Sequence, residues 1–125
     1  LSIGAEWITA KAEIHDQAAA LISHLPVLIS ATLLKTIAKE KDPQTLKLAR
    51  HLASTGFSDT TRVGGGNPEL GLSMMKNNTK SILELLTTYK SSLQELESKI
   101  TSEEWESLKE ELENTKGFRQ NFSKK

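Results

Sequence analysis

Hydrophobic residues recur every three or four positions between about Glu13 and Lys39. The members of this apolar stripe are Ala18, Leu21, Ile22, Leu25, Ile29, Leu33 and Ile37. Such spacing is typical of one face of an α-helix, so the pattern predicts a long helix. Pro26 lies inside it and has no amide hydrogen to donate to the carbonyl of Ile22. We therefore expect a kink at this point.

Two Asx-Pro pairs predict the starts of two further helices. In Asp42-Pro43 and Asn67-Pro68, a good N-cap residue precedes a proline at the first helical position. The first of these helices is expected to run to about Ser54, with Gly56 ending it. The second is expected to break at Asn77-Asn78.

The C-terminal part of the chain predicts a helical hairpin. From Ile82 the apolar positions are 82, 86, 89, 93, 96 and 100, a short heptad seam. Thr101 or Ser102 is expected to cap a last helix, with Glu103 and Glu104 in its first turn, and Gly117 to end it. The chain is thus predicted to be all-α, with about five helices including a long Pro-kinked helix and a helical hairpin. A short strand at Ile3 to Ile8 is the one β candidate, and 125 residues fit a single domain over residues 1–125.

Composition narrows the classes of function. Lys plus Arg and Asp plus Glu number 16 each, and no basic stripe is present, so nucleic acid is not an expected partner. The chain has no cysteine, which excludes disulfides and thiolate zinc sites. His24 and Val27 have helical ligand spacing, but valine cannot bind a metal, so no metal site is expected. No stretch reaches the roughly 18 consecutive apolar residues of a membrane span, so no membrane association is expected.

The segment 55–67 is rich in glycine and hydroxyl residues and is expected to be a functional loop. Arg62 lies within it and could present its planar guanidinium to a carboxylate or phosphate. Alternatively, Arg62 is solvated or paired with Asp59 for structure. The run Gly64-Gly65-Gly66 lacks the preceding strand and the G-x-G-x-x-G spacing of a dinucleotide-binding loop, so no cofactor site is expected here.

His24 precedes Leu25-Pro26 on the long helix. It could donate a hydrogen bond to an anionic substrate. Alternatively, it is a partly buried histidine whose partner is a carbonyl freed by the proline. His15-Asp16 and His51 are expected at the surface or at an interface.

Two segments carry a family resemblance. Residues 15–26, HDQAAALISHLP, resemble the HD-x-x-x-A-x-x-SHLP stretch of prephenate and arogenate dehydrogenases. Residues 56–63, GFSDTTRV, followed by Asn67-Pro68, resemble the GF-x-D-x-TR loop of the same family. The order and separation of the two segments also match, so the resemblance covers nearly the whole chain.

The resemblance implies a fold, a reaction and partners. The fold would be an intertwined dimerisation domain similar to the C-terminal domain of 6-phosphogluconate dehydrogenase. A Rossmann domain that binds NADP or NAD would lie N-terminal to this chain, which alone would be inactive. The reaction would be the oxidative decarboxylation of prephenate or arogenate in tyrosine biosynthesis, carried out by a cytoplasmic homodimer.

The resemblance also implies roles for individual residues. Arg62 corresponds to the arginine that binds a substrate carboxylate, and His24 to the first histidine of the family's HLPH sequence, at the substrate pocket. Asp59 would orient Arg62 or support the loop, and Thr61 would join the substrate-binding group. The catalytic histidine would belong to the N-terminal domain. Val27 replaces the second histidine, and HLPV with GGGNPELG is more similar to arogenate-using members, which implies arogenate and NADP.

Two other interpretations stay open from the sequence. The heptad seam could belong to a non-catalytic helical module that binds a partner helix. The chain could also be the helical half of a related β-hydroxyacid dehydrogenase, although His24-Leu25-Pro26 and Thr61-Arg62 argue against this.

Overall fold

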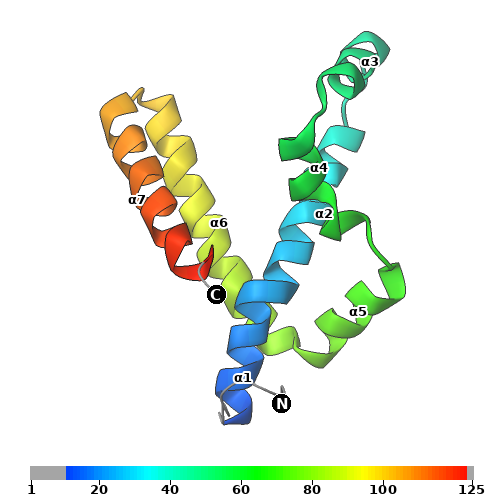
Figure 1. The fold of residues 1–125 in the computed structure, drawn as a ribbon, viewed down its shortest axis with the longest axis vertical. Coiled ribbons are helices and arrows are strands. Elements are labelled where there is room, and N and C mark those ends of the chain that lie inside the picture. The colour runs from blue at the N-terminus through cyan, green and yellow to red at the C-terminus, as the bar shows by residue number, and fades with distance from the viewer. Residues whose placement is uncertain (1–10, 124–125) are drawn as a thin grey trace. The chain divides into compact units, whose positions relative to one another are not determined.

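The computed structural model describes residues 11–123, and the regular structure in that range is entirely helical (Figure 1). The elements are α1 (Ala12–Ala19), η1 (Ala20–His24), α2 (Leu25–Ala38), α3 (Pro43–Leu52), α4 (Thr55–Thr61), η2 (Val63–Gly65), α5 (Pro68–Asn77), α6 (Thr79–Thr101) and α7 (Trp105–Ser123). The all-α prediction is confirmed, with more helices than the five expected. The predicted strand at Ile3 to Ile8 lies outside the described residues.

Contacts divide the chain into two compact units, Leu1–Leu86 and Thr87–Lys125. Each unit is described by itself below. The expectation of one domain over residues 1–125 stays a prediction.

The long N-terminal helix is continuous over Ala12–Ala38 (Figure 1). Just before Pro26 the backbone hydrogen bonds of this helix change from the α-helical to the π-helical pattern. The amide of Leu25 donates to the carbonyl of Ala20, five residues back, as in a π-helix. A π-helical turn, η1, thus ends at His24, two residues before Pro26. The kink expected at Pro26 stays a prediction.

The same helix corrects one expectation from the sequence. By length and composition, Ala12–Ala38 is apolar enough to cross a membrane, with a mean hydropathy of 1.6 over its most apolar window. Core helices of soluble proteins pass the same test when other elements cover them. Only 11% of that window is buried within this chain. The helix therefore presents a large apolar surface that the described residues leave uncovered.

Both Asx-Pro helix starts are confirmed. The Asp42 carboxylate accepts from the amides of Gln44 and Thr45, each at 3.3 Å. The Thr45 hydroxyl and the Gln44 amide lower the pKa of Asp42 by bonding to its charged form. The Asn67 side chain accepts from the amide of Glu69 at 2.9 Å and caps α5. Asn78 ends α5, as the sequence predicted.

The prediction of a loop over residues 55–67 is wrong. Residues Thr55–Thr61 form α4, and Val63–Gly65 form a 3-10 turn. The hydroxyls of Thr60 and Thr61 donate to carbonyls four residues back, each at 2.8 Å, instead of competing with the helix. Gly56 therefore lies inside α4, and α3 already ends at Leu52.

The core of the first unit is small. Its buried apolar residues are Ala20, Ile82 and Leu85, against which Leu25, Leu28, Met75 and Leu86 pack. Large apolar side chains stay exposed within the chain, among them Ile22 at 70% and Leu70 at 57%. A core of this size leaves much apolar surface for a partner to cover.

The second unit contains the end of α6 and α7, which lie side by side in Figure 1. The Lys99 amine and the Glu111 carboxylate pair between them, and this pairing raises the pKa of Lys99. The predicted hairpin is confirmed, but its details differ. Neither Thr101 nor Ser102 caps α7, because α6 runs through Thr101 and α7 begins at Trp105.

Gly117 does not end the last helix, which continues to Ser123. An exposed glycine inside a helix lowers the stability of the helix by only about 1 kcal/mol relative to alanine, so the helix can continue through it. Glycine alone was therefore a weak stop signal.

Candidate functional site

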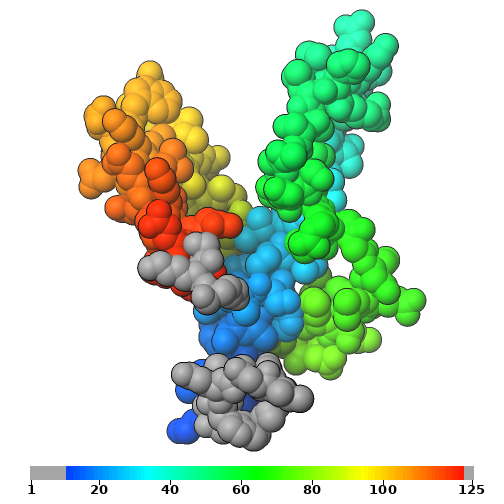
Figure 2. Space-filling view, in the orientation of Figure 1, coloured from blue at the N-terminus to red at the C-terminus, as the bar shows by residue number. Residues whose placement is uncertain are grey.

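Arg62 lies at the junction of α4 and η2, and a buried serine fixes this junction to α2. The Ser30 hydroxyl donates to the carbonyl of Thr60 at 2.7 Å and accepts from the amide of Gly64 at 2.8 Å. Ser30 is 2% exposed. These two bonds lie on either side of Arg62 in the sequence, so the backbone that carries the guanidinium is held against α2. Figure 2 shows the green atoms of the segment after α3 lying against the blue and cyan atoms of the long helix.

The approach of η2 to α2 requires glycine at position 64. A Cβ atom added there would lie 2.4 Å from the Ala31 nitrogen and 2.5 Å from the Ser30 carbonyl carbon. Real Cβ atoms do not come this close to backbone atoms, so any side chain would push the turn away from α2. At Gly65, by contrast, a Cβ would meet nothing within 4 Å. The triple glycine thus allows close packing at one position.

Arg62 lines a cavity of about 350 Å³ between the long helix and the segment from η2 to α5. Its apolar lining consists of Ile22, Pro26, Val27, Val63, Leu70 and Met74. Polar groups come from Ser23, Arg62 and Asn67. A largely apolar cavity with a few polar groups, of this volume, is typical of sites for small molecules.

The Arg62 side chain has no acidic partner within the part of the chain that the structure describes. Asp59 is exposed on α4, and no ion pair joins it to Arg62. The Thr61 hydroxyl is bonded to the carbonyl of Phe57 inside α4. The guanidinium is therefore a cation at an apolar cavity whose charge no described carboxylate neutralises.

His24 lines a second cavity, of about 300 Å³, together with His15, Asp16, Met74 and Asn78 among others. Ser23 and His24 are neighbours on a helix and point in different directions, which explains why they line different cavities. Within one chain, the structure does not bring His24 into the cavity of Arg62. The ring Nδ1 of His24 lies 3.2 Å from the Asn78 side-chain nitrogen. The partner of His24 is thus a side-chain amide, not the freed carbonyl that the sequence suggested.

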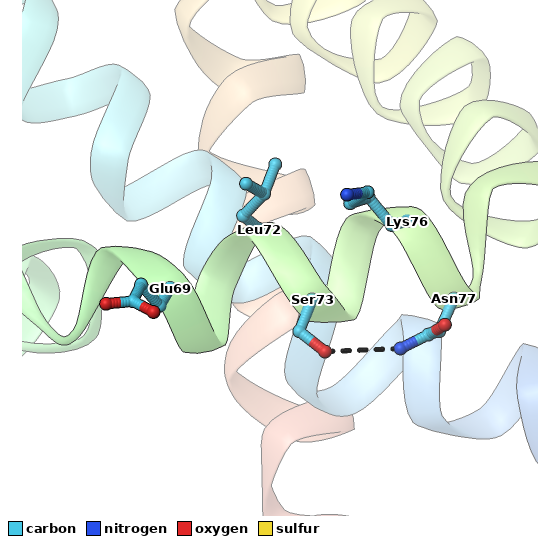
Figure 3. Close-up of a pocket in the computed structure, with 5 residues that line it drawn as sticks. All are labelled: Glu69, Leu72, Ser73, Lys76 and Asn77. Carbon is cyan, nitrogen blue, oxygen red and sulfur yellow. Dashed lines mark hydrogen bonds between the residues drawn. The ribbon is translucent and has the colours of Figure 1, made fainter.

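A further cavity, of about 290 Å³, lies along α5 (Figure 3). All five labelled residues, Glu69, Leu72, Ser73, Lys76 and Asn77, come from this one helix. The Asn77 amide donates to the Ser73 hydroxyl at 3.2 Å, within the helix. Because no other element contributes groups, this hollow is a less suitable binding site than the one at Arg62.

The sequence patterns did not indicate Ser30, and they placed Asn78 only at a break between two helices. A serine on an apolar helix face gives no sign of its partners, because Thr60 and Gly64 follow 30 and 34 residues later. Asn78 was recognisable as a helix boundary. Its contact with His24, 54 residues earlier, depends on the tertiary fold.

Comparison with known proteins places this chain in a family. Residues 11–114 match the model of the prephenate dehydrogenase dimerization domain. The chain is 30% identical over 119 residues to the prephenate dehydrogenase of Lactococcus lactis, and covers 32% of that protein. It is 29% identical over 117 residues to the cyclohexadienyl dehydrogenase of Zymomonas mobilis, and covers 40% of that protein.

Two solved structures of such dehydrogenases are also similar to this chain. The crystal structure of Synechocystis arogenate dehydrogenase matches 95% of this chain and 43% of its own, with a TM-score of 0.93 and 45% identity. That of prephenate dehydrogenase from A. aeolicus, in complex with hydroxyphenyl propionate and NAD+, matches 91% of this chain and 39% of its own, with a TM-score of 0.80 and 25% identity. The chain thus spans about a third to two-fifths of the length of these relatives. It belongs to the prephenate dehydrogenase family, in which it forms the dimerization domain.

Proposed function

We propose that the protein containing this chain catalyses the NAD(P)-dependent oxidative decarboxylation of arogenate or prephenate. In this proposal the chain supplies the group that binds a substrate carboxylate and the surface that forms a homodimer. The observation that carries the proposal is Arg62, a cation without a described acidic partner at an apolar cavity of about 350 Å³.

The chemistry of the cavity suits such a substrate. A guanidinium donates two parallel hydrogen bonds to a carboxylate and keeps its charge at physiological pH. The apolar side chains around it, such as Val27, Val63 and Met74, can contact a six-membered carbon ring. Holding the backbone of Arg62 through Ser30 reduces the entropy lost when the substrate binds.

The other proposed site residues have separate roles. We assign His24 a contact with a part of the substrate that the Arg62 cavity does not hold, since the two residues line different cavities. Thr61 stabilises the last turn of α4 and so supports Arg62. We propose that Asp59, an exposed residue of the same short helix, approaches the guanidinium when substrate is bound.

The described residues do not fit a nicotinamide dinucleotide. The amide of Gly64 already donates to the Ser30 hydroxyl, so this amide of the triple glycine is not available to bind a phosphate. We therefore propose that the nucleotide-binding domain and the catalytic histidine lie outside these 125 residues, and that this chain alone is inactive. Similarity to an arogenate dehydrogenase at 45% identity supports arogenate as the substrate, and we propose NADP as its cofactor.

A homodimer is proposed because the matched family model is a dimerization domain and much apolar surface is uncovered within one chain. We also propose that the protein is cytoplasmic.

Substituting Arg62 tests the proposed function. In the intact enzyme, Arg62→Ala should lower kcat/KM, mainly through a higher KM, because a charge-assisted pair with the substrate carboxylate is lost. The expected loss is about 2 to 4 kcal/mol, or roughly 30- to 1000-fold. Arg62→Lys should recover only part of this, because an ammonium group cannot make the bidentate contact.

Arg50→Ala is the matched control, since Arg50 is an exposed arginine in α3 that does not line the cavity. Steady-state kinetics with arogenate and with prephenate would measure both variants and the substrate preference. An unchanged KM in Arg62→Ala would contradict the assignment.

A further inference from the structure

The side chain of Asn78 makes two contacts that together define the state of the His24 ring. Its nitrogen lies 2.8 Å from the backbone carbonyl of Asp16 and 3.2 Å from Nδ1 of His24. Asp16 and His24 belong to α1 and η1, whereas Asn78 lies between α5 and α6. All three residues fall within the first unit.

The carbonyl of Asp16 fixes the orientation of the Asn78 amide. A backbone carbonyl can only accept, so the atom facing it must be the amide nitrogen. That nitrogen carries a second hydrogen, which is directed to Nδ1 of His24. Because a donor faces Nδ1, this ring nitrogen must accept, and the single proton of the neutral imidazole then resides on Nε2.

The backbone of Asn78 is not needed for this arrangement. Its amide donates to Met74 at the end of α5, and its carbonyl accepts from Ile82 at the start of α6. The side chain is therefore available for the two cross-helix contacts, and a substitution can remove them while both backbone bonds stay.

We propose that Asn78 is a positioning residue that holds His24 as the Nε2-protonated tautomer. In this form Nε2 donates a hydrogen bond, which is what a histidine that contacts an anionic or hydroxyl-bearing substrate needs. The contact between Nε2 and a substrate rests on the proposed function, but the assignment of the tautomer does not.

The ¹⁵N chemical shifts of the His24 ring test the tautomer directly, because they separate a protonated from an unprotonated ring nitrogen. Spectra would be recorded on the intact protein labelled with ¹⁵N-histidine, with the His24 signals assigned by their loss in His24→Gln. The wild type should show Nε2 protonated and Nδ1 unprotonated. In Asn78→Asp the carboxylate can only accept, so the proton should move to Nδ1.

Asn114→Ala is the matched control for these spectra, because Asn114 is an exposed asparagine of α7 that does not line the cavity of His24. It should leave the His24 shifts unchanged. An unprotonated Nε2 in the wild type, or unaltered His24 shifts in Asn78→Asp, would overturn the proposal.

Kinetics separate this proposal from the proposed function. Asn78→Ala should lower kcat/KM by about 3- to 10-fold, the loss expected when one hydrogen bond no longer orients the ring. If His24→Gln leaves kcat/KM unchanged while the ring shifts behave as expected, the substrate role of His24 is wrong and the tautomer assignment stands.

Discussion

Ser30 connects two segments that are distant in the sequence, and both of its hydrogen bonds lie next to Arg62. A buried hydroxyl that donates once and accepts once leaves no polar group unsatisfied in this contact. The position of the Arg62 backbone therefore depends on a residue that does not line the cavity. We expect substitutions at this contact to affect both stability and substrate binding.

Gly64→Ala tests the close approach of η2 to α2. The added Cβ would overlap backbone atoms of Ser30 and Ala31, so we expect a loss of about 1 to 3 kcal/mol in the free energy of unfolding. Denaturant unfolding measures this loss. Gly65→Ala, where the added atom meets nothing within 4 Å, is the matched control and should change stability much less. Equal effects of the two substitutions would contradict the packing described for this turn.

At the level of elements, local signals were sufficient where a helix end depends only on its own residues. The caps at Asp42-Pro43 and Asn67-Pro68 are of this kind, since the acceptor and its amides are at most three residues apart. The long helix was also predicted correctly, because the spacing of its apolar residues is a local property of the sequence.

Sequence patterns did not predict the structure where contacts between residues far apart in the sequence decide it. The segment 55–67 has the composition of a loop, yet Thr55–Thr61 and Val63–Gly65 are helical. The contacts that hold this segment join it to Ser30, which lies 30 residues before Thr60 and 34 before Gly64. Arg62 was a candidate from the composition of its segment and received a role from the family resemblance, whereas the cavity that it lines could be seen only in the fold. Asn78 was correctly expected at a helix boundary, but its contact with His24 was not predictable from spacing.

The turn between α6 and α7 holds a residue in an unfavourable conformation. Glu103 has a φ of 53°, and the amides of Glu103 and Glu104 bond back to Ile100 and Lys99. This is the Schellman arrangement, in which glycine is preferred at the left-handed position. The turn is therefore stable despite the side chain at that position.

We expect Glu103→Gly to stabilise the protein by roughly 0.5 to 1 kcal/mol, because relief of the left-handed strain exceeds the entropy that glycine adds to the unfolded chain. Glu103→Ala keeps a Cβ and should not stabilise to the same extent. Thermal unfolding of the two variants measures the difference. A lower Tm for Glu103→Gly than for Glu103→Ala would contradict this account of the turn.

At the scale of the whole molecule, the described residues bury few apolar side chains for their number. The longest helix has 11% of its most apolar window buried, and Leu21 within it is 50% exposed. In a family whose matching domain dimerises, a second copy is the simplest cover for this surface.

Sedimentation of the chain at tens of micromolar should therefore give a dimer. Leu21→Asp should raise the dimer dissociation constant by roughly tenfold or more, since burying a leucine contributes about 1.5 to 3 kcal/mol. Lys35→Asp, an exposed polar position on the same helix, should have a smaller effect. A monomeric wild-type chain under these conditions would contradict the homodimer.

The most direct test of the central claim is a crystal structure of the intact enzyme with nicotinamide cofactor and a hydroxyphenyl propionate-type ligand bound. The account predicts two guanidinium nitrogens of Arg62 within about 2.7 to 3.2 Å of the ligand's carboxylate oxygens. A ligand carboxylate bound by other groups, with Arg62 directed into solvent in both protomers, would contradict it.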